Sequence, residues 1–211
     1  MAIVHVMRHG QVDNPRGVLY ERLPGYHLSG LGRQMAEQAA TFFADLPITH
    51  LRCSPLERAQ ESMRPIAALF PLVDVVTDTR LIEAGNVFAG QVMGSTGAAA
   101  KSPRNWRYLT DPFRPSWGEP YADIARRMTA GILAAAETVG LGGQAALVSH
   151  QLPIWVARLL AEGKHLWHDP RKRECTLASV TSFHVDGGYI RGIDYAEPAR
   201  DLLPAGPHFG F

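Results

Sequence analysis

The sequence predicts an α/β fold, a doubly wound three-layer sandwich with a mainly parallel sheet. Short apolar runs of strand character alternate with longer stretches whose apolar residues recur at helical spacing. The run 145–149 is almost wholly apolar, as is typical of a central strand covered on both faces. Segment 85–118 breaks the alternation and is rich in Gly, Pro, Ser and Trp. It predicts a small excursion over the carboxyl ends of the strands.

The first predicted strand and helix lie at the amino-terminal end. Residues 3–7 form a short apolar run that is followed at once by polar residues and glycine. Residues 28–47 place apolar side chains on one helical face, and Ser29 is suited to cap the start of this helix. The two segments therefore predict a buried strand that leads, through a long polar loop, into an amphipathic helix.

Two strands and a helix are predicted next. The strands are 48–54 and 73–81, and the helix between them covers 55–70. Pro55 suits the first helical turn, where its missing N–H costs nothing. Pro65 lies inside the same segment, so we expect it to kink or shorten the helix.

The second half of the chain continues the alternation. Residues 121–140 and 152–163 have the spacing of amphipathic helices, and the apolar strand 145–149 lies between them. Residues 178–195 contain two strand-like runs separated by Asp-Gly-Gly, which predicts a hairpin with a tight turn.

Composition narrows the class of protein. The chain has 211 residues, of which 46% are hydrophobic and 19% charged, which suits one domain over 1–211. The net charge of +1 gives no reason to expect nucleic acid or a membrane surface as a partner. Two cysteines make no disulfide framework, and no secretory or membrane-spanning segment is evident, so we expect a cytoplasmic protein. The oligomeric state stays open, with a homodimer as one option.

Charged and nucleophilic residues follow the predicted strands. In open α/β sheets, ligands bind beyond the carboxyl ends of the strands. The residues expected to converge there are two arginines, two histidines and a glutamate, namely Arg8, Arg58, His9, His150 and Glu83. Arginine forks bind phosphate oxygens, a neutral histidine can attack phosphorus, and a carboxylic acid can protonate a departing alkoxide. Together they predict phosphoryl transfer through a phosphohistidine.

The order of these motifs resembles a known family. The segments RHGQ, SPLERA, LIEAGNVFAG and LVSHQLPIW, read in this order, are similar to the histidine phosphatase superfamily in its phosphoglycerate-mutase-like branch. The resemblance implies that His9 is the phosphorylated residue and that Arg8, Arg58 and His150 complete the phosphate pocket. It further implies that Glu83 is the proton donor.

The sequence departs from the family pattern at two places. Gln11 and Val12 stand where the family usually has Glu and then Thr or Ser, so a hydroxyl near the phosphate is missing, and Asn14 is a candidate replacement donor. Gln151 stands where the second histidine is usually followed by glycine, and we include it among the candidate substrate-binding residues.

Several assignments remain open from the sequence. Glu119 is a rival to Glu83 for the general acid, and Asp13 lies close to the nucleophile in sequence. In the excursion, Arg104 is a candidate substrate-binding residue, and Trp106 belongs either to a lid or to a small core of its own.

The leading hypothesis is a phosphomonoesterase that acts on a small phosphorylated metabolite. We expect neither a metal nor another cofactor, because the arginines supply the positive charge. A phosphoglycerate mutase is the first alternative and would need further cations such as Lys101, Arg104 and Arg107. A non-catalytic phospho-ligand binder is the second, and the natural substrate is not evident.

Overall fold

The computed structural model describes residues 1–92 and 118–204. A six-stranded sheet has the strand order β3-β2-β4-β1-β5-β6. In chain order the strands are β1 (Ala2–Arg8), β2 (Ile48–Cys53), β3 (Val75–Thr77), β4 (Gln144–Ser149), β5 (Val180–Asp186) and β6 (Tyr189–Ala196). The apolar strand predicted at 145–149 is thus β4, and it lies in the interior of the sheet between β2 and β1.

The sheet is mainly parallel, as predicted. Strands β1 to β4 pair in parallel, whereas β5 runs antiparallel to both of its neighbours, β1 and β6. In the register between β1 and β4, Arg8 lies opposite Ser149. The carboxyl ends of these two central strands are therefore level, and the residues after them emerge side by side.

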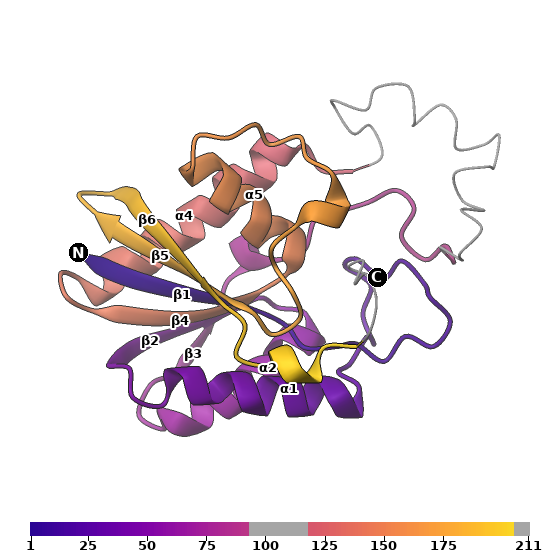
Figure 1. The fold of residues 1–211 in the computed structure, drawn as a ribbon, viewed down its shortest axis with the longest axis horizontal. Coiled ribbons are helices and arrows are strands. Elements are labelled where there is room, and N and C mark those ends of the chain that lie inside the picture. Colours follow the sequence, from indigo (N-terminus) through magenta and orange to yellow (C-terminus); the bar gives the residue numbers. More distant parts are fainter. Residues whose placement is uncertain (93–117, 205–211) are drawn as a thin grey trace.

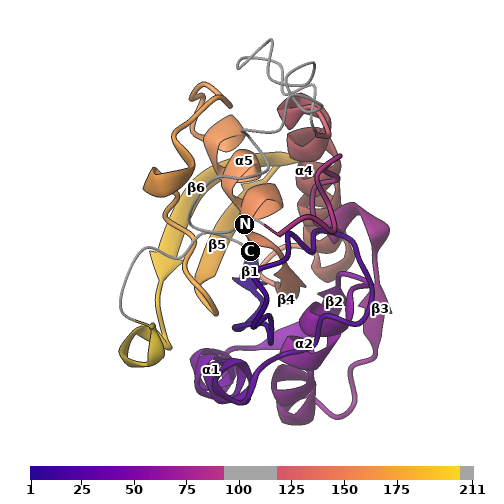
Figure 2. The same ribbon diagram turned by 90° about the vertical axis from the view of Figure 1, so that its right-hand side faces the viewer.

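Helices cover both faces of the sheet. The α-helices are α1 (Gly30–Ala40), α2 (Glu57–Leu69), α4 (Tyr121–Val139) and α5 (Gln151–Ala161). Short 3₁₀ helices are η1 (Thr41–Phe43), η2 (Thr79–Leu81), η4 (Pro170–Lys172) and η5 (Arg200–Leu202). Figures 1 and 2 show α1 and α2 on one side of the sheet and α4 and α5 on the other. The predicted three-layer sandwich is confirmed.

The alternation of side chains along β4 explains its two-sided burial. Ala146 and Val148 join the apolar cluster beneath α1 and α2, whereas Ala145 and Leu147 join the cluster beneath α4 and α5. Successive strand residues point to opposite faces, so a strand covered on both sides needs apolar residues at every position.

The predicted strand 73–81 is wrong in length. Strand β3 ends at Thr77, and the chain then turns through η2 before it reaches Glu83. Asp78 causes this turn, because its carboxylate accepts a hydrogen bond from the backbone of Arg80 and also pairs with the Arg52 guanidinium. Glu83 therefore approaches the sheet edge from a loop and not from a strand end.

The structure also bears on two expectations about prolines in the α2 region. Pro55 precedes the helix, whose N-cap residue is Leu56, so Pro55 is not in the first turn. Pro65 lies inside the helix but does not end it, since α2 continues to Leu69. Burial of Met63 and Ile66 against the sheet stabilises the helix on both sides of Pro65.

The predicted hairpin is confirmed. Asp186 of β5 pairs with Tyr189 of β6, which leaves Gly187 and Gly188 as a two-residue turn. Their φ angles of 56° and 79° lie in the left-handed region, which glycine adopts without steric cost.

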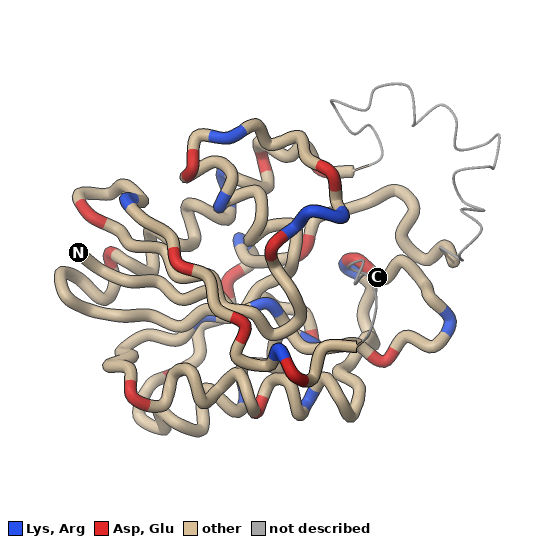
Figure 3. Tube along the Cα trace, in the orientation of Figure 1, with Lys and Arg blue, Asp and Glu red and all other residues tan. Residues whose placement is uncertain are grey.

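Charged residues of both signs are interspersed along the trace, in keeping with the net charge of +1 (Figure 3). Most of the predicted excursion 85–118, including Arg104 and Trp106, lies outside the described residues. No helix in the described ranges is long and apolar enough to span a membrane. The assignment of 1–211 to one domain stays a prediction.

Candidate active site

The carboxyl ends of β1, β2 and β4 bring three polar residues together. The His9 backbone N–H donates to the carbonyl of Ser149, at 3.1 Å between nitrogen and oxygen. The Ser54 backbone N–H donates to the carbonyl of Val148, at 3.0 Å. Because β4 lies between β1 and β2, the residues that follow it, beginning with His150, are flanked by both His9 and Ser54.

The His9 side chain is buried, and a hydrogen bond orients its ring. Its Nδ1 atom lies 2.7 Å from the carbonyl oxygen of Gly10. A carbonyl oxygen can only accept, so Nδ1 carries the ring proton and the neutral ring presents the Nε2 lone pair. Burial, followed by the charges of Arg58 and Arg8, holds the pKa of His9 well below its usual value. These features give a neutral imidazole at physiological pH.

Close backbone packing fixes the loop that carries His9. A Cβ atom on Gly10 would lie 2.3 Å from the carbonyl oxygen of Gly32 in α1, and one on Gly32 would lie 1.9 Å from the carbonyl oxygen of Gln11. Glycine is therefore required at both positions. The Gly10 backbone N–H also donates to the Ser62 hydroxyl, at 3.1 Å.

Arg58 lies fully buried beside His9. Its Nη2 donates to the Glu21 carbonyl at 2.6 Å, and the Tyr20 ring lies 4.7 Å from the guanidinium carbon. Burial lowers the pKa of Arg58 relative to an exposed arginine. Arg8 is also buried, and its Nη1 donates to the Cys175 carbonyl at 2.7 Å. Both guanidinium groups are thus held by backbone carbonyls, and neither has a carboxylate partner among these contacts.

His150 completes the cluster. Its ring centroid lies 5.1 Å from that of His9, and its Nε2 lies 2.7 Å from the Ser54 hydroxyl. Burial and then the Arg58 charge hold the pKa of His150 well below its usual value. Like His9, it is a neutral imidazole surrounded by fixed positive charge.

Several nitrogen atoms of this cluster are buried but unpartnered. Within residues 1–92 and 118–204, the Nε of Arg8, the Nε and Nη1 of Arg58 and the Nδ1 of His150 have no hydrogen-bond partner. Buried donors without partners are costly, so proteins rarely keep them without a reason. Their gathering around His9 marks a place where an anion with several acceptor oxygens would satisfy them.

Glu83 is buried at the same edge. Its Oε1 accepts a hydrogen bond from the Ala84 backbone N–H at 2.8 Å. Its own carbonyl accepts from Arg22 Nε at 2.7 Å and from Arg127 Nη2 at 3.2 Å. These backbone clamps fix the position from which the carboxyl group extends.

The rival acids lie in other environments. Glu119 is paired with Arg22 at 2.6 Å and with Arg127 at 2.9 Å. Its carboxylate therefore holds the two arginines that donate to the Glu83 carbonyl. Asp13 is exposed. Neither environment matches the buried position of Glu83.

The departures from the family pattern have local structural explanations. Gln11 accepts a hydrogen bond from the Ser29 hydroxyl, which itself caps α1, as predicted, by accepting from the Gly32 backbone. Asn14 donates to and accepts from the backbone of Val18, so its amide closes a loop. The prediction that Asn14 binds phosphate stays untested, and its side chain has another role in this structure.

Gln151 lies buried at the start of α5. Its amide nitrogen donates to the Cys175 carbonyl at 3.2 Å, and its oxygen accepts from Arg173 at 3.4 Å. Gln151 therefore supports the segment that also binds Arg8, and its predicted contact with substrate stays a prediction.

Sequence reasoning missed three residues of this site, namely Tyr20, Glu21 and Arg173. Tyr20 and Glu21 lie in the long loop after the first strand, and Arg173 lies before β5. Arg173 Nε donates to Nε2 of His168 at 2.8 Å, and burial lowers its pKa. No spacing or motif distinguished these residues, because loop residues are placed by tertiary contacts.

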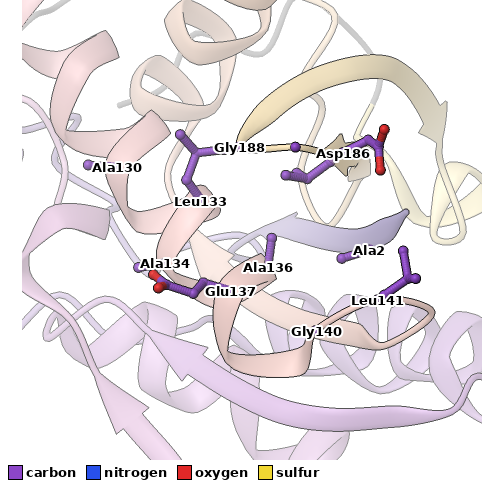
Figure 4. A pocket seen from close by; sticks show the side chains of 12 residues that line it. Ala2, Ala130, Leu133, Ala134, Ala136, Glu137, Gly140, Leu141, Asp186 and Gly188 are labelled. Carbon is purple, nitrogen blue, oxygen red and sulfur yellow. The ribbon is translucent and has the colours of Figure 1, made fainter.

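A different hollow lies at the opposite end of the strands (Figure 4). Its volume is about 670 Å³, and it is bounded by the start of β1, by α4 and by the β5–β6 turn. Apart from the carboxylates Glu137 and Asp186, its lining is made of small or apolar residues. It holds no nucleophile or cation from the described residues, so the candidate site is the cluster around His9.

The fold and this cluster define an α/β protein whose polar residues gather at the carboxyl edge of the sheet, where such folds bind anionic ligands. The chain belongs to the histidine phosphatase superfamily (branch 1), whose family model matches residues 4–196.

Comparison with known proteins identifies a relative over nearly the whole chain and another over part of it. An uncharacterized protein of Mycobacterium tuberculosis, Rv0525, is 51% identical over 196 residues, covering 93% of this chain and 96% of the relative. The 2,3-bisphosphoglycerate-dependent phosphoglycerate mutase of Thermoplasma acidophilum is 38% identical over 86 residues, covering 40% of this chain and 42% of that protein.

Solved structures share the fold. The mycobacterial glucosyl-3-phosphoglycerate phosphatase Rv2419c, in complex with VO3, has a TM-score of 0.72 and 26% identity, covering 92% of this chain and 95% of that chain. The phosphoserine phosphatase of Entamoeba histolytica, in complex with 3-phosphoglyceric acid, has a TM-score of 0.73 and 16% identity, covering 94% and 100% of the two chains. The second likeness concerns the fold alone.

Proposed function

We propose that this protein is a phosphomonoesterase that works through a phosphohistidine on His9. The observation that carries the proposal is the set of buried, unpartnered nitrogen atoms of Arg8, Arg58 and His150 around that ring. A phosphoryl group has three non-bridging oxygens, and this number of acceptors suits the donors present. Membership of the histidine phosphatase superfamily supports the same reaction class.

The first half-reaction forms the phosphohistidine. The Nε2 lone pair of His9 attacks phosphorus in line with the ester oxygen, so the Nε2–P bond forms while the P–O ester bond breaks. Glu83 gives its proton to the departing oxygen, which leaves as an alcohol. Arg8 and Arg58 stabilise the charge on the three equatorial oxygens of the transition state.

The second half-reaction regenerates the enzyme. A water molecule takes the place of the alcohol and gives a proton to the Glu83 carboxylate as its oxygen attacks phosphorus. The Nε2–P bond breaks, the electron pair returns to His9, and inorganic phosphate departs. Glu83 thus acts as acid and then as base, which requires it to face the bond opposite His9.

His150 is proposed as a neutral donor to the phosphoryl group. If the Ser54 hydroxyl donates to Nε2, the ring proton of His150 lies on Nδ1, which is the unpartnered atom. The low pKa of His150 keeps the ring uncharged, so release of phosphate is not opposed by another full positive charge.

The substrate is proposed to be a small phosphorylated metabolite. The phosphatases of similar fold act, by their names, on glucosyl-3-phosphoglycerate and on phosphoserine, both of which carry a carboxylate near the phosphate. Arg173 is the cation that we propose to bind such a carboxylate, because it is half-buried and its charge interacts with that of Glu83 at the same edge.

A phosphoglycerate mutase remains the second candidate, because part of the chain is 38% identical to such an enzyme. A mutase returns the phosphoryl group to a second hydroxyl of the retained acid, whereas a phosphatase gives it to water. Assays of 3-phosphoglycerate with and without a bisphosphoglycerate primer separate the two. Primer-dependent conversion without phosphate release would favour the mutase.

The deciding experiment measures phosphate release from a panel of phosphomonoesters, together with rapid quenching of a labelled substrate. We expect turnover and an acid-labile, base-stable label on the protein, which His9→Ala abolishes while phosphate binding persists. Full turnover by His9→Ala would falsify the proposed nucleophile. Phosphate binding with no turnover of any ester by the unmodified protein would instead favour a non-catalytic binder.

A further inference from the structure

Arg173 is held by neutral groups, although an arginine close by pairs with a carboxylate. It follows η4 directly and is half-buried. Two residues earlier, Arg171 pairs with the Asp169 carboxylate at 2.8 Å. Among the described residues, the hydrogen bonds of Arg173 go instead to the side chains of His168 and Gln151. Its positive charge is therefore not paired with an anion in this structure.

Hydrogen bonds fix the tautomer of the His168 ring. Its Nδ1 lies 2.7 Å from the carbonyl oxygen of Leu166, which can only accept, so Nδ1 carries the ring proton. Its Nε2 lies 2.8 Å from Nε of Arg173, which can only donate, so Nε2 offers its lone pair. The ring that holds Arg173 is thus a neutral imidazole with a defined donor side and acceptor side.

Aromatic contacts hold the His168 ring in place. The Tyr121 ring of α4 lies 5.5 Å from it between centroids, and the Trp155 ring of α5 lies 6.0 Å away with an edge-to-face orientation. Both partners belong to the helices that cover one face of the sheet. The acceptor for Arg173 is therefore fastened to the packed body of the protein.

Gln151 joins Arg173 to the cluster around the two histidines. Its Oε1 accepts from Nη1 of Arg173 at 3.4 Å, and its amide nitrogen donates to the Cys175 carbonyl at 3.2 Å. The same carbonyl accepts from Nη1 of Arg8 at 2.7 Å. Because Gln151 also follows His150 directly in the chain, these contacts place Arg173 beside the proposed phosphate pocket.

One edge of the Arg173 guanidinium is open to a ligand. Its Nη2 makes no hydrogen bond within the described residues, and Nη1 makes only the long one to Gln151. Two neighbouring N–H groups of an arginine match the two oxygens of a carboxylate. The charge of Arg173 also interacts with that of Glu83, the proposed proton donor, which agrees with a position on the side of the leaving group.

We infer that Arg173 binds a carboxylate of the leaving group and so gives a preference for phosphomonoesters of hydroxy acids, and that His168 is the positioning residue that holds its guanidinium. The inference rests on the proposed function and assigns the contacts that orient the cation named there. His168 itself does not touch the substrate.

The hold on Arg173 has a physical consequence for binding. A free arginine side chain loses rotamer freedom when it binds a ligand, and this loss opposes binding. Contacts with His168 and Gln151 fix the side chain before the ligand arrives. Loss of the His168 contact should therefore weaken binding of the carboxylate without changing the chemistry at phosphorus.

The experiment compares esters that differ in the carboxylate. The pairs are 3-phosphoglycerate with glycerol 3-phosphate, and phosphoserine with phosphoethanolamine. We expect the unmodified protein to release phosphate with a higher kcat/KM from the acid of at least one pair. Arg173→Gln should lower kcat/KM for that acid by roughly 10- to 100-fold, as is typical of a lost charge-assisted hydrogen-bonded pair, and change the neutral partner much less.

The matched control for charge is Arg171→Gln. It removes an exposed positive charge two residues from Arg173, and it should leave the ratio of kcat/KM between acid and partner unchanged. No preference for either acid in the unmodified protein would overturn the inference. Equal losses on both members of a pair in Arg173→Gln would do the same.

Two variants test the positioning role of His168. His168→Phe keeps a ring against Tyr121 and Trp155 but has no acceptor for Arg173, whereas His168→Gln keeps an acceptor oxygen. We expect His168→Phe to raise KM for the acid, with kcat nearly unchanged and the neutral partner little affected. His168→Gln should recover part of the loss. A loss of kcat on both esters in both variants would indicate a merely structural role and contradict the positioning.

A spectroscopic measurement tests the contact without turnover. In protein labelled with ¹⁵N at histidine, NMR at pH 7 should show a protonated Nδ1 and an unprotonated Nε2 for His168, with its signals identified by their loss in His168→Phe. A proton on Nε2 of His168 would exclude the hydrogen bond from Arg173 and overturn the positioning role.

The inference and the proposed function fail in distinguishable ways. If the unmodified protein hydrolyses p-nitrophenyl phosphate and forms the labelled His9, the proposed function stands whatever Arg173→Gln does. If it hydrolyses no ester, calorimetric binding of 3-phosphoglycerate and glycerol 3-phosphate still tests the carboxylate contact. Tighter binding of the acid that Arg173→Gln abolishes supports the contact, and equal binding of the two compounds overturns it.

Discussion

The Ser54 hydroxyl and Nε2 of His150 lie 2.7 Å apart, although the two residues are 96 positions apart in sequence. Ser54 follows β2 and His150 follows β4, and these strands are neighbours in the sheet. The contact fixes the His150 ring and leaves its Nδ1 as a buried nitrogen without a hydrogen-bond partner in the described structure. Strand order thus determines which ring nitrogen is available to a ligand.

The unpartnered nitrogen atoms of Arg58 predict a large effect of its removal. Arg58→Ala should lower kcat/KM by roughly 10²- to 10³-fold, because charge-assisted donors to a transition state have about this effect. Arg64→Ala, on the exposed side of the same helix, is the matched control and should change kcat/KM little. Steady-state kinetics on one ester checks both. Equal losses in the two variants would indicate a general effect on α2.

Glu83 should matter most for esters with poor leaving groups. Glu83→Gln removes the proton donor, so the rate of phosphoryl transfer from an alkyl phosphate should fall far more than that from p-nitrophenyl phosphate. Single-turnover kinetics isolates this step from hydrolysis of the intermediate. Glu119→Gln weakens the ion pairs with the two arginines that hold the Glu83 backbone, so it should lower the rates with both esters by similar factors. If Glu119→Gln shows the selective loss instead, Glu119 is the acid.

Buried neutral His9 should reduce stability in mild acid. In the unfolded chain a histidine binds a proton as pH falls below about 6.5, whereas folded His9 stays neutral because its pKa is held well below this value. Folding stability from this group is therefore lost as pH falls, by up to about 1.4 kcal/mol per pH unit. The difference in unfolding free energy, His9→Gln minus unmodified protein, should become more positive from pH 6.5 to 5. A pH-independent difference would contradict this.

Glu21 should change the pH dependence of folding stability in the opposite direction from His9. Its folded pKa is raised to about 8, so the folded protein keeps a proton that the unfolded chain releases near pH 4.5. Stability from this group is present below about pH 4.5 and is lost as pH rises toward 8, by up to about 1.4 kcal/mol per unit. Glu21→Gln should thus gain relative stability from pH 5 to 8. Denaturant titrations at several pH values check the trend, which should level off above pH 8.

Gly10 should tolerate no side chain. The Cβ atom of Gly10→Ala would meet the Gly32 carbonyl oxygen at 2.3 Å, so the loop that carries His9 must move. We expect a loss of about 1–3 kcal/mol in unfolding free energy, together with loss of turnover. Gly30→Ala is the control, since a Cβ there meets nothing within 4 Å and alanine favours the helix. Similar stability of the two variants would show that the loop can adjust.

Much of the fold was predictable because short sequence patterns indicate its helices, strands and turns. Alternating apolar runs and helical periodicity placed α1, α4, β4 and α5, and the Asp-Gly-Gly sequence placed the β5–β6 turn. The third strand was predicted too long, because the Asp78 interactions that turn the chain involve Arg52 from a neighbouring strand. Pro65 was expected to kink or shorten α2; it does not end the helix, which continues to Leu69 and packs against the sheet.

The sequence by itself determined the fold class and nominated Arg8, His9, Arg58, Glu83 and His150, because each follows or lies near a recognisable element. Only the tertiary structure decided which nitrogen atoms are left without partners, that Glu119 pairs with two arginines, and that the Glu21 carbonyl accepts a hydrogen bond from Arg58. The physical reason is that burial, tautomer and charge coupling depend on distances between residues far apart in sequence. Those distances are set by strand order and loop packing, which local patterns do not encode.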